Sequence, residues 1–260
     1  MRSGGKRKAV GVGASVLAAV VVTGCGSGGG NAGGGSVFGP DDKGSGSASP
    51  SAEPDDSSPA PKDPYLSQAE LEDAILTAAD LGPGWTRMPV QTSAGTGKAQ
   101  PTAADAALRA NCPPYREQNN ASSSPAARYL SASFTAPKNA DVPYLEYELT
   151  ITVRQRSAAD LAKAVEYGRR SGVECKNMPV AEPGNPYTLD YSALKNLPPY
   201  GDEAAGLYET AQNATGLNAT SWVLVRFGNT LVEISGSPNA VEAFMSPAVL
   251  KVKRALDAKN

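Results

Sequence analysis

The chain has 260 residues, with 24 lysines and arginines, 26 aspartates and glutamates, and no histidine. The lack of histidine removes the side chain that most often serves as a general base or as a metal ligand. The slightly acidic balance argues against nucleic acid as a partner.

Residues 1–24 have the order of a secretory signal peptide. Four basic residues come first, an uncharged apolar run fills residues 9–22, and small residues lead to Cys25. The run of about 14 residues is shorter than the roughly 20 that a helix needs to cross a bilayer, which favours a cleaved signal. The ending Val22-Thr23-Gly24-Cys25 resembles the lipobox of bacterial lipoproteins. This resemblance implies that Cys25 carries diacylglycerol and an N-acyl chain such as palmitate, and anchors the protein on the extracytoplasmic face of the cell membrane. An ordinary secretory signal with a coincidental cysteine is the alternative.

Residues 25–63 are rich in Gly, Ser and Pro and nearly free of bulky apolar side chains. Such a segment cannot bury enough surface to order itself, so we predict a disordered tether. A flexible coil of this length spans roughly 30–35 Å. Because the signal holds four basic residues and no acidic ones, the mature chain has 20 basic and 26 acidic residues, a net charge of about −6. This charge also argues against anionic lipid headgroups as partners.

Residues 64–260 are long enough for one domain with its own core. Ser67 and Glu70 have the spacing of a capping box, which predicts a helix that runs through residue 78 and ends at Gly82-Pro83-Gly84. An extended piece over residues 85–90 and a loop over residues 91–100 follow. Residues 103–111 predict a second helix, with Cys112 at its end and Pro113-Pro114 stopping it.

Strict alternation of apolar and polar residues over residues 144–154 predicts a strand of a sheet that is buried on one side and antiparallel. Residues 129–135 predict a neighbouring strand. Ser157 caps a predicted helix over residues 158–171, with Leu161, Val165 and Gly168 on its inner face.

The last third of the chain predicts more sheet. We expect a strand over residues 205–211 and a hairpin of residues 221–227 and 230–235, joined by Gly228-Asn229. Residues 177–185 and 213–218 are expected to be loops, and a closing helix is expected to begin at Ser246-Pro247. Together these elements predict an α+β domain, with helices packed on a mostly antiparallel sheet.

Three cysteines are present, and acylation of Cys25 would leave Cys112 and Cys175 as a pair. In an oxidising compartment two remaining thiols are expected to form a disulfide. A redox or metal site would need CxxC-like spacing or further ligands, and the sequence has neither.

Two patterns suggest catalysis without completing it. Ser192-Ala193-Leu194-Lys195 matches the S-x-x-K pattern of penicillin-interacting serine enzymes, but their Ser-Asp-Asn and Lys-Thr-Gly motifs do not occur. Glu146 and Glu148 share a strand face and would suit paired-carboxylate hydrolysis, but we expect them to lie on the solvated side of an amphipathic strand.

No other pattern predicts a cofactor or a metal site. Asp41-Asp42 and Asp55-Asp56 lack calcium-loop spacing, and there is no phosphate-binding glycine loop, nucleotide fingerprint or zinc pattern. Aromatic side chains are a softer signal, because rings line ligand pockets as well as cores. We expect Trp85 and Trp222 to pack in the core. Four tyrosines are clustered in the sequence: Tyr187, Tyr191, Tyr200 and Tyr208.

Several short motifs together resemble a known family: residues 76–85 (LTAADLGPGW), a helix followed by Cys175, Gly201-Asp202-Glu203-Ala204, and residues 225–232 (VRFGNTLV). They are similar to the actinobacterial lipoproteins and sensor modules grouped around the extracellular domain of the mycobacterial kinase PknH. The resemblance implies an antiparallel sheet with flanking helices and a ligand-binding cleft. The kinase version has two disulfides, whereas this chain has cysteines for one and no kinase domain.

The sequence thus predicts a membrane-anchored, non-catalytic binding or sensor module of the cell envelope, with an unidentified small or apolar ligand or an envelope protein as partner. An envelope hydrolase that uses Ser192 and Lys195 or the two glutamates is one alternative. A passive structural or interaction lipoprotein is the other. The ligand-binding residues are not predicted by the sequence.

Overall fold

In a computed structural model of the protein, residues 64–92, 101–120, 128–136 and 147–259 are described. The predicted signal, Cys25 and the tether lie outside these residues, as do most of the 91–100 loop and Glu146. The described residues form one antiparallel eight-stranded sheet, in the order β1-β2-β3-β8-β7-β6-β5-β4. The predicted fold class, helices on a mostly antiparallel sheet, is confirmed.

The strands follow the alternation of the sequence closely in the centre of the sheet. They are β1 (Thr86–Arg87), β2 (Arg128–Thr135), β3 (Glu148–Gln155), β4 (Met178–Val180), β5 (Tyr187–Ala193), β6 (Glu203–Asn213), β7 (Gly216–Phe227) and β8 (Thr230–Gly236). The helices are α1 (Gln68–Ala74), α2 (Ala78–Leu81), α3 (Ala103–Asn111), α4 (Pro113–Asn120), α5 (Ala158–Glu174) and α6 (Pro238–Lys259).

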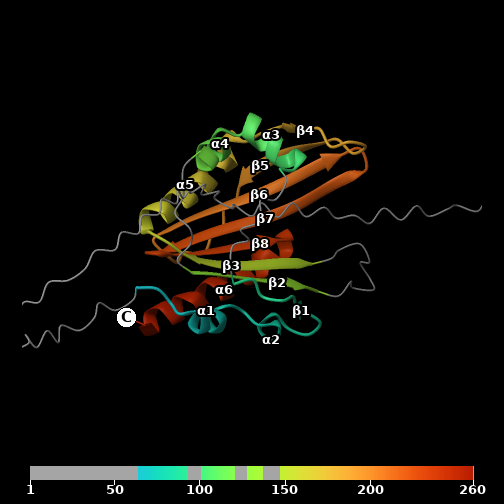
Figure 1. The fold of residues 1–260 in the computed structure, drawn as a ribbon. Coiled ribbons are helices and arrows are strands. Elements are labelled where there is room, and N and C mark those ends of the chain that lie inside the picture. Colours follow the sequence, from blue (N-terminus) through green and yellow to red (C-terminus); the bar gives the residue numbers. More distant parts are fainter. Residues whose placement is uncertain (1–63, 93–100, 121–127, 137–146, 260) are drawn as a thin grey trace, which may run out of the picture.

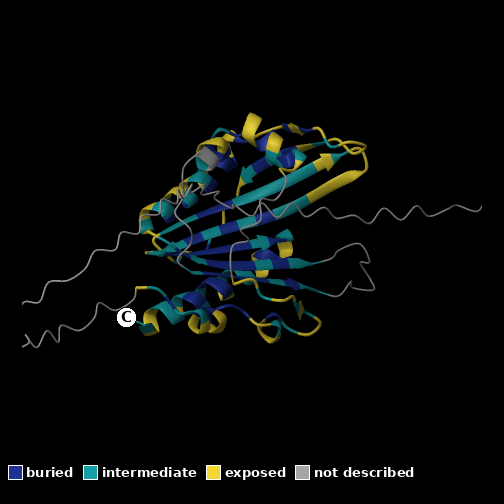
Figure 2. Ribbon diagram, in the orientation of Figure 1, coloured by how far each residue is buried: buried dark blue, intermediate teal, exposed yellow. Residues whose placement is uncertain are grey.

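The helices lie on both faces of the sheet. Figure 1 shows α1, α2 and α6 on one face and α3, α4 and α5 on the other. The larger core lies under α1 and α6, where Leu149, Ile151 and Val153 of β3 are fully buried. Alternate residues of the same strands point to the opposite face. There Thr152 and Glu233 are also buried, so the prediction of a sheet covered on one side was wrong. Figure 2 shows buried stretches, in dark blue, along the central strands of the sheet.

On the second face two smaller cores hold the α3–α5 layer to the sheet. One contains Leu161, Val165, Ala205 and Leu231 beneath α5. The other lies under α3 and α4 and includes the disulfide between Cys112 and Cys175, whose Cα atoms are 4.8 Å apart. Cys112 is the C-cap of α3 and Cys175 the C-cap of α5, so the bond joins two helix ends, as the sequence predicts.

Several boundaries differ from the prediction because local caps override longer patterns. The first predicted helix is two helices: α1 ends at Ala74, and Thr77 with Asp80 forms a second capping box that starts α2. Pro113 does not end the helical region but begins α4, since proline fits the first helical position. For the same reason α6 begins at Pro238, and Pro247 lies inside it.

The strand predictions were too short in two places, and one helix prediction was too short as well. The expected loop 177–185 contains β4, which pairs with β5 through Met178 and Leu189. The expected loop 213–218 is the tight end of the β6–β7 hairpin, where Asn213 pairs with Gly216. The helix α5 continues three residues beyond residue 171, because Gly172 packs into it against Ala193 of β5: an added Cβ would lie 3.0 Å from the Ala193 backbone nitrogen.

Candidate functional site

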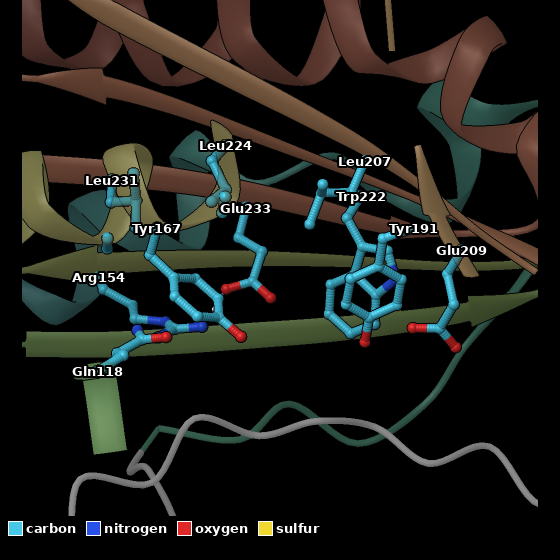
Figure 3. A pocket seen from close by; sticks show the side chains of 12 residues that line it. Gln118, Arg154, Tyr167, Tyr191, Leu207, Glu209, Trp222, Leu224, Leu231 and Glu233 are labelled. Carbon is cyan, nitrogen blue, oxygen red and sulfur yellow. Dashed lines mark hydrogen bonds and ion pairs between the residues drawn. The ribbon is translucent and has the colours of Figure 1, made fainter. Parts of the chain in front are cut away.

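A cleft lies on the second face of the sheet, between the α4–α5 layer and strands β3 and β5–β8 (Figure 3). The cavity itself has a volume of about 70 Å³, and the empty space is about 600 Å³ when the open solvent at its mouth is included. Its lining combines aliphatic, aromatic and charged side chains: Gln118, Arg154, Ala164, Tyr167, Gly168, Tyr191, Leu207, Glu209, Trp222, Leu224, Leu231 and Glu233. A mostly apolar hollow with a few polar groups is the usual form of a small-molecule site.

Strand register brings the sheet residues of the cleft together. Tyr191 of β5 is directly opposite Glu209 of β6, and Leu207 of β6 is directly opposite Trp222 of β7. Leu224 of β7 is directly opposite Glu233 of β8. Directly opposed residues of antiparallel strands share a face, so all of these side chains project toward α5.

Small residues on α5 bring the helix close to the sheet beside the cleft. A Cβ on Gly168 would lie 3.0 Å from Leu224 Cδ1 and 3.3 Å from Ala205 Cβ. Gly168 and Ala164, one helical turn apart on α5, therefore have side chains small enough to leave room for the cleft that Tyr167 and the leucines also line.

One end of the cleft holds an ion pair between adjacent strands. The Arg154 guanidinium of β3 donates to the Glu233 carboxylate of β8, and the two side chains are 14% and 11% exposed. Each of these desolvated charges is stabilised by the other, since removing one partner would leave the other buried and unpaired. Figure 3 shows Tyr167 and Gln118 beside this pair.

The other end holds Glu209, Tyr191 and Trp222 (Figure 3). Burial raises the pKa of the Glu209 carboxyl above its ordinary value, and the hydrogen bond that it accepts from Tyr191 opposes this only in part. Burial also raises the pKa of Tyr191, and the nearby charge of Glu209 raises it further. Desolvation therefore favours the neutral form of both groups.

Three polar atoms of lining residues are buried and have no hydrogen-bond partner among the described residues: Gln118 Oε1, Arg154 Nε and Trp222 Nε1. Buried polar groups in proteins are nearly always paired, and one left unpaired costs about 1–3 kcal/mol. One acceptor and two donors on lining residues are thus without a partner among the described residues.

The serine and lysine of the S-x-x-K pattern do not reach the cleft. Ser192 lies in β5 between Tyr191 and Ala193, so its side chain points to the opposite face, where its hydroxyl donates to the Tyr208 carbonyl at 3.4 Å. Lys195 is exposed. In the enzymes that the pattern resembles the serine opens a helix, and here it lies in a strand.

Glu148 of the predicted glutamate pair is the first residue of β3 and does not line the cleft, and Glu146 lies outside the described residues. A different pair of glutamates, Glu209 and Glu233, does line it. Glu233 is opposite Leu224, which is opposite Ala205, so the two glutamates are two strands apart and offset by four residues. These offsets amount to roughly 10 Å and 13 Å, or about 16 Å between Cα atoms. The Glu233 carboxylate is also engaged in the ion pair with Arg154.

The sequence suggested that aromatic side chains could line a pocket or fill the core, and the structure agrees with the expectation for some of them and not for others. Tyr191, one of the clustered tyrosines, lines the cleft, whereas Trp222 lines it in place of the predicted core position. Trp85 is in the larger core as expected, edge-on to Phe244 with ring centroids 5.6 Å apart.

Glu209 and Glu233 were missed, although the sequence carries a signal for both. Glu209 takes an apolar position in the alternation of Ala205, Leu207 and Ala211. Glu233 similarly follows Leu231 by two residues.

Within the described ranges no group of three or more metal-ligating side chains is found. In the same part of the chain, no helix has the length and apolarity needed to cross a membrane.

Comparison with known proteins gives a limited result. No protein-family model matches the chain, and no curated protein matches its sequence. Among solved structures, the fold is similar to the extracellular domain of PknH from Mycobacterium tuberculosis, with 11% identity, a TM-score of 0.46, and coverage of 73% of this chain and 97% of that one. A protein of Mycobacterium smegmatis, an Rv0999 ortholog, matches with 12% identity, a TM-score of 0.35, and coverage of 71% and 94%.

Proposed function

We propose that the domain is a non-catalytic binding module whose ligand occupies the cleft between α4–α5 and the sheet. The observation that carries the proposal is the set of three unpartnered polar atoms, on Gln118, Arg154 and Trp222, in an otherwise mostly apolar hollow. A bound molecule would supply the missing hydrogen bonds, and aromatic and aliphatic walls would bury its body.

The proposal includes the address that the sequence predicts. The mature protein would be held on the extracytoplasmic face of the cell membrane by the lipid on Cys25, with residues 26–63 as the spacer. In this position the cleft would meet envelope components or molecules that enter the envelope. A sensor-like role, in which the bound state is passed to an envelope protein, agrees with this location and with the motif resemblance.

The hydrolase alternatives find little support in the geometry. Ser192 points away from the cleft, and the Glu233 carboxylate is engaged in an ion pair with Arg154. A passive interaction lipoprotein remains the competing proposal, and it requires that the cleft bind nothing.

The two tryptophans of the chain allow a direct test. In an NMR spectrum of ¹⁵N-labelled mature protein the two indole N–H signals report on two places, Trp222 in the cleft and Trp85 in the larger core. Fractions of envelope lipids and cell-wall fragments are titrated in, and we expect at least one fraction to shift the Trp222 signal while the Trp85 signal stays in place.

A variant that fills the cleft gives the matched control. Ala164→Phe places a ring in the cleft and should abolish the shift, whereas Ala159→Phe, on an exposed position of the same helix, should leave it unchanged. If no fraction moves the Trp222 signal or stabilises the protein against heat, the binding function is refuted and the passive role stands.

A further inference from the structure

We propose that the ligand of the cleft is an organic ammonium ion with an apolar body, whose charge pairs with Glu209 and contacts the rings of Tyr191 and Trp222. This inference rests on the binding function proposed above and adds the chemical class of the ligand.

The first argument is the charge balance of the cleft. Its lining contains three charged residues, Arg154, Glu209 and Glu233. Arg154 and Glu233 neutralise each other through their ion pair. No Lys or Arg among the described residues forms an ion pair with Glu209, so one carboxyl is left without a counterion. A ligand cation would supply it.

The second argument is the surroundings of Glu209. Tyr191 is directly opposite it, and Trp222 is opposite Leu207, two residues along the same strand. Such diagonal neighbours in a sheet have Cβ atoms about 7–8 Å apart, within reach of an aromatic side chain. A carboxylate beside aromatic faces is the combination that attracts ammonium ions, since the faces of the rings carry negative potential.

The other ligand classes fit less well. An anion would meet two glutamates, and the one arginine of the lining is already paired. A neutral molecule would remove Glu209 further from water without providing a charge or a counterion. The ammonium ion is the ligand whose binding offsets the desolvation of this carboxyl.

The rest of the cleft indicates the shape of the ligand. Leu207 and Leu224 lie between the Glu209 end and the Arg154–Glu233 end, whereas Leu231 lies at the latter end, directly opposite Arg154 (Figure 3). The two ends are separated by about 16 Å, as the strand register gives. An alkyl or aryl chain fits between them, and a polar group at its far end would reach Arg154 Nε and Gln118 Oε1.

Binding of a cation should be coupled to release of a proton. The titratable groups that face Glu209 are Tyr191 and Tyr187 of β5 and Tyr167 of α5, and each has its pKa raised by burial, so all three stay neutral. Glu209 is therefore the group that changes charge. Because its own pKa is raised, the cation competes with a proton, and affinity should increase as pH increases through this pKa.

The test compares three probes of equal length and different charge: octylammonium, octanol and octanoate, each below its micelle concentration and at fixed salt. The mature protein is titrated with each, and the Trp222 indole signal gives the affinity. We expect octylammonium to bind at least about tenfold tighter than either of the other two, and to release a proton that calorimetry in buffers of different ionisation enthalpy detects.

Two isosteric variants separate the site from general attraction to an acidic surface. Glu209→Gln should remove the preference for the cation, so that octylammonium binds no more tightly than octanol. Glu166→Gln, on the outer side of α5 where Glu166 is 52% exposed, should change neither.

The possible outcomes distinguish this inference from the binding function. Equal affinity of the wild-type protein for all three probes, or a cation preference that survives Glu209→Gln, would overturn the ammonium inference and leave the binding function in place. If no probe moves the Trp222 signal, both fail. Proton release by the wild-type protein supports the inference even if Glu209→Gln does not fold.

Discussion

Glu209 lowers the stability of the fold when it ionises, in addition to its proposed role in binding a ligand. Its pKa is raised in the folded state by burial, while the unfolded chain exposes the same carboxyl to water. The folded protein therefore binds more protons than the unfolded chain between the ordinary glutamate pKa of about 4.3 and the higher folded value. Stability from this group is fully present below the lower pKa and is lost as pH rises through the higher one.

We predict that Glu209→Gln removes this loss. The amide keeps the shape of the protonated carboxyl and cannot ionise, so the variant should be more stable than the wild-type protein at neutral pH and not at pH 4. Urea unfolding at several pH values measures the difference, with Glu166→Gln as the exposed control. A wild-type and variant difference that does not change with pH would contradict the assignment of a raised pKa.

The residues of the site were the hardest part to predict from the sequence. Cys112 and Cys175 could be paired by elimination, because each follows a helix and no other partner was left. Trp222, Arg154 and Glu233 gave no such signal, since they meet only through the register of neighbouring strands. A one-residue change of register would turn each of them to the other face, and the sequence of one strand does not specify the alignment of five.

At the scale of helices and strands, predictions were correct where the signal lay within a few neighbouring residues, as in helix caps and tight turns. The capping residues Ser67 and Ser157 accept hydrogen bonds from Glu70 and Asp160 as predicted, and Gly228-Asn229 turns the β7–β8 hairpin. The split between α1 and α2 had a readable signal as well, the second capping box of Thr77 and Asp80. By contrast, β4 and β5 are stabilised by pairing with partners far along the chain, and short strands of this kind carry little signal of their own.

The disulfide is the covalent link between the helices above the cleft. It closes a loop of 63 residues between the ends of α3 and α5, and the small core around it contains Leu108, Tyr115 and Met178. The α3–α4 pair has no large core of its own, so we expect this bond to hold the layer in place.

We predict that the double variant Cys112→Ala/Cys175→Ala is less stable by up to about 4 kcal/mol, the chain-entropy value for a loop of this length. Hydrogen exchange should increase most in α3, α4 and β4, and least in β3, β7 and β8, which the larger core holds. Oxidised and reduced wild-type protein provide the comparison. Unchanged urea midpoints, or a uniform increase in exchange across the sheet, would contradict the local role.

At the scale of the whole molecule, the two faces of the sheet are packed differently: one face stabilises the fold, and the other contains the cleft. The face under α1 and α6 is a continuous apolar core, which accounts for most of the stabilisation by burial. The opposite face has small cores at α3–α5 and the cleft between them, where charged and polar groups replace apolar ones. Because the core under α1 and α6 stabilises the fold, the other face can retain unpartnered polar atoms, although each of them lowers the stability of the folded state.

If Cys25 is lipidated as we propose, the position of this domain relative to the membrane would depend on the residues that follow Cys25. The domain begins near residue 64, so a tether of residues 26–63, if flexible, would place the cleft at a variable distance of roughly 30–35 Å from the surface. A domain held in this way can reach soluble molecules and the membrane surface alike. Several acyl chains give durable attachment, at about 0.8 kcal/mol for each buried CH₂ group.

We predict that Cys25→Ser releases the protein from the membrane, since serine cannot form the thioether that carries diacylglycerol. The variant should appear in the medium or remain with its signal uncleaved, and fractionation followed by mass spectrometry of the N-terminus distinguishes these two results from a lipidated chain. Cys112→Ala/Cys175→Ala serves as the matched control, because it also removes cysteine and should stay in the membrane fraction. A Cys25→Ser protein that is cleaved and still membrane-bound would show that another part of the chain provides the anchor.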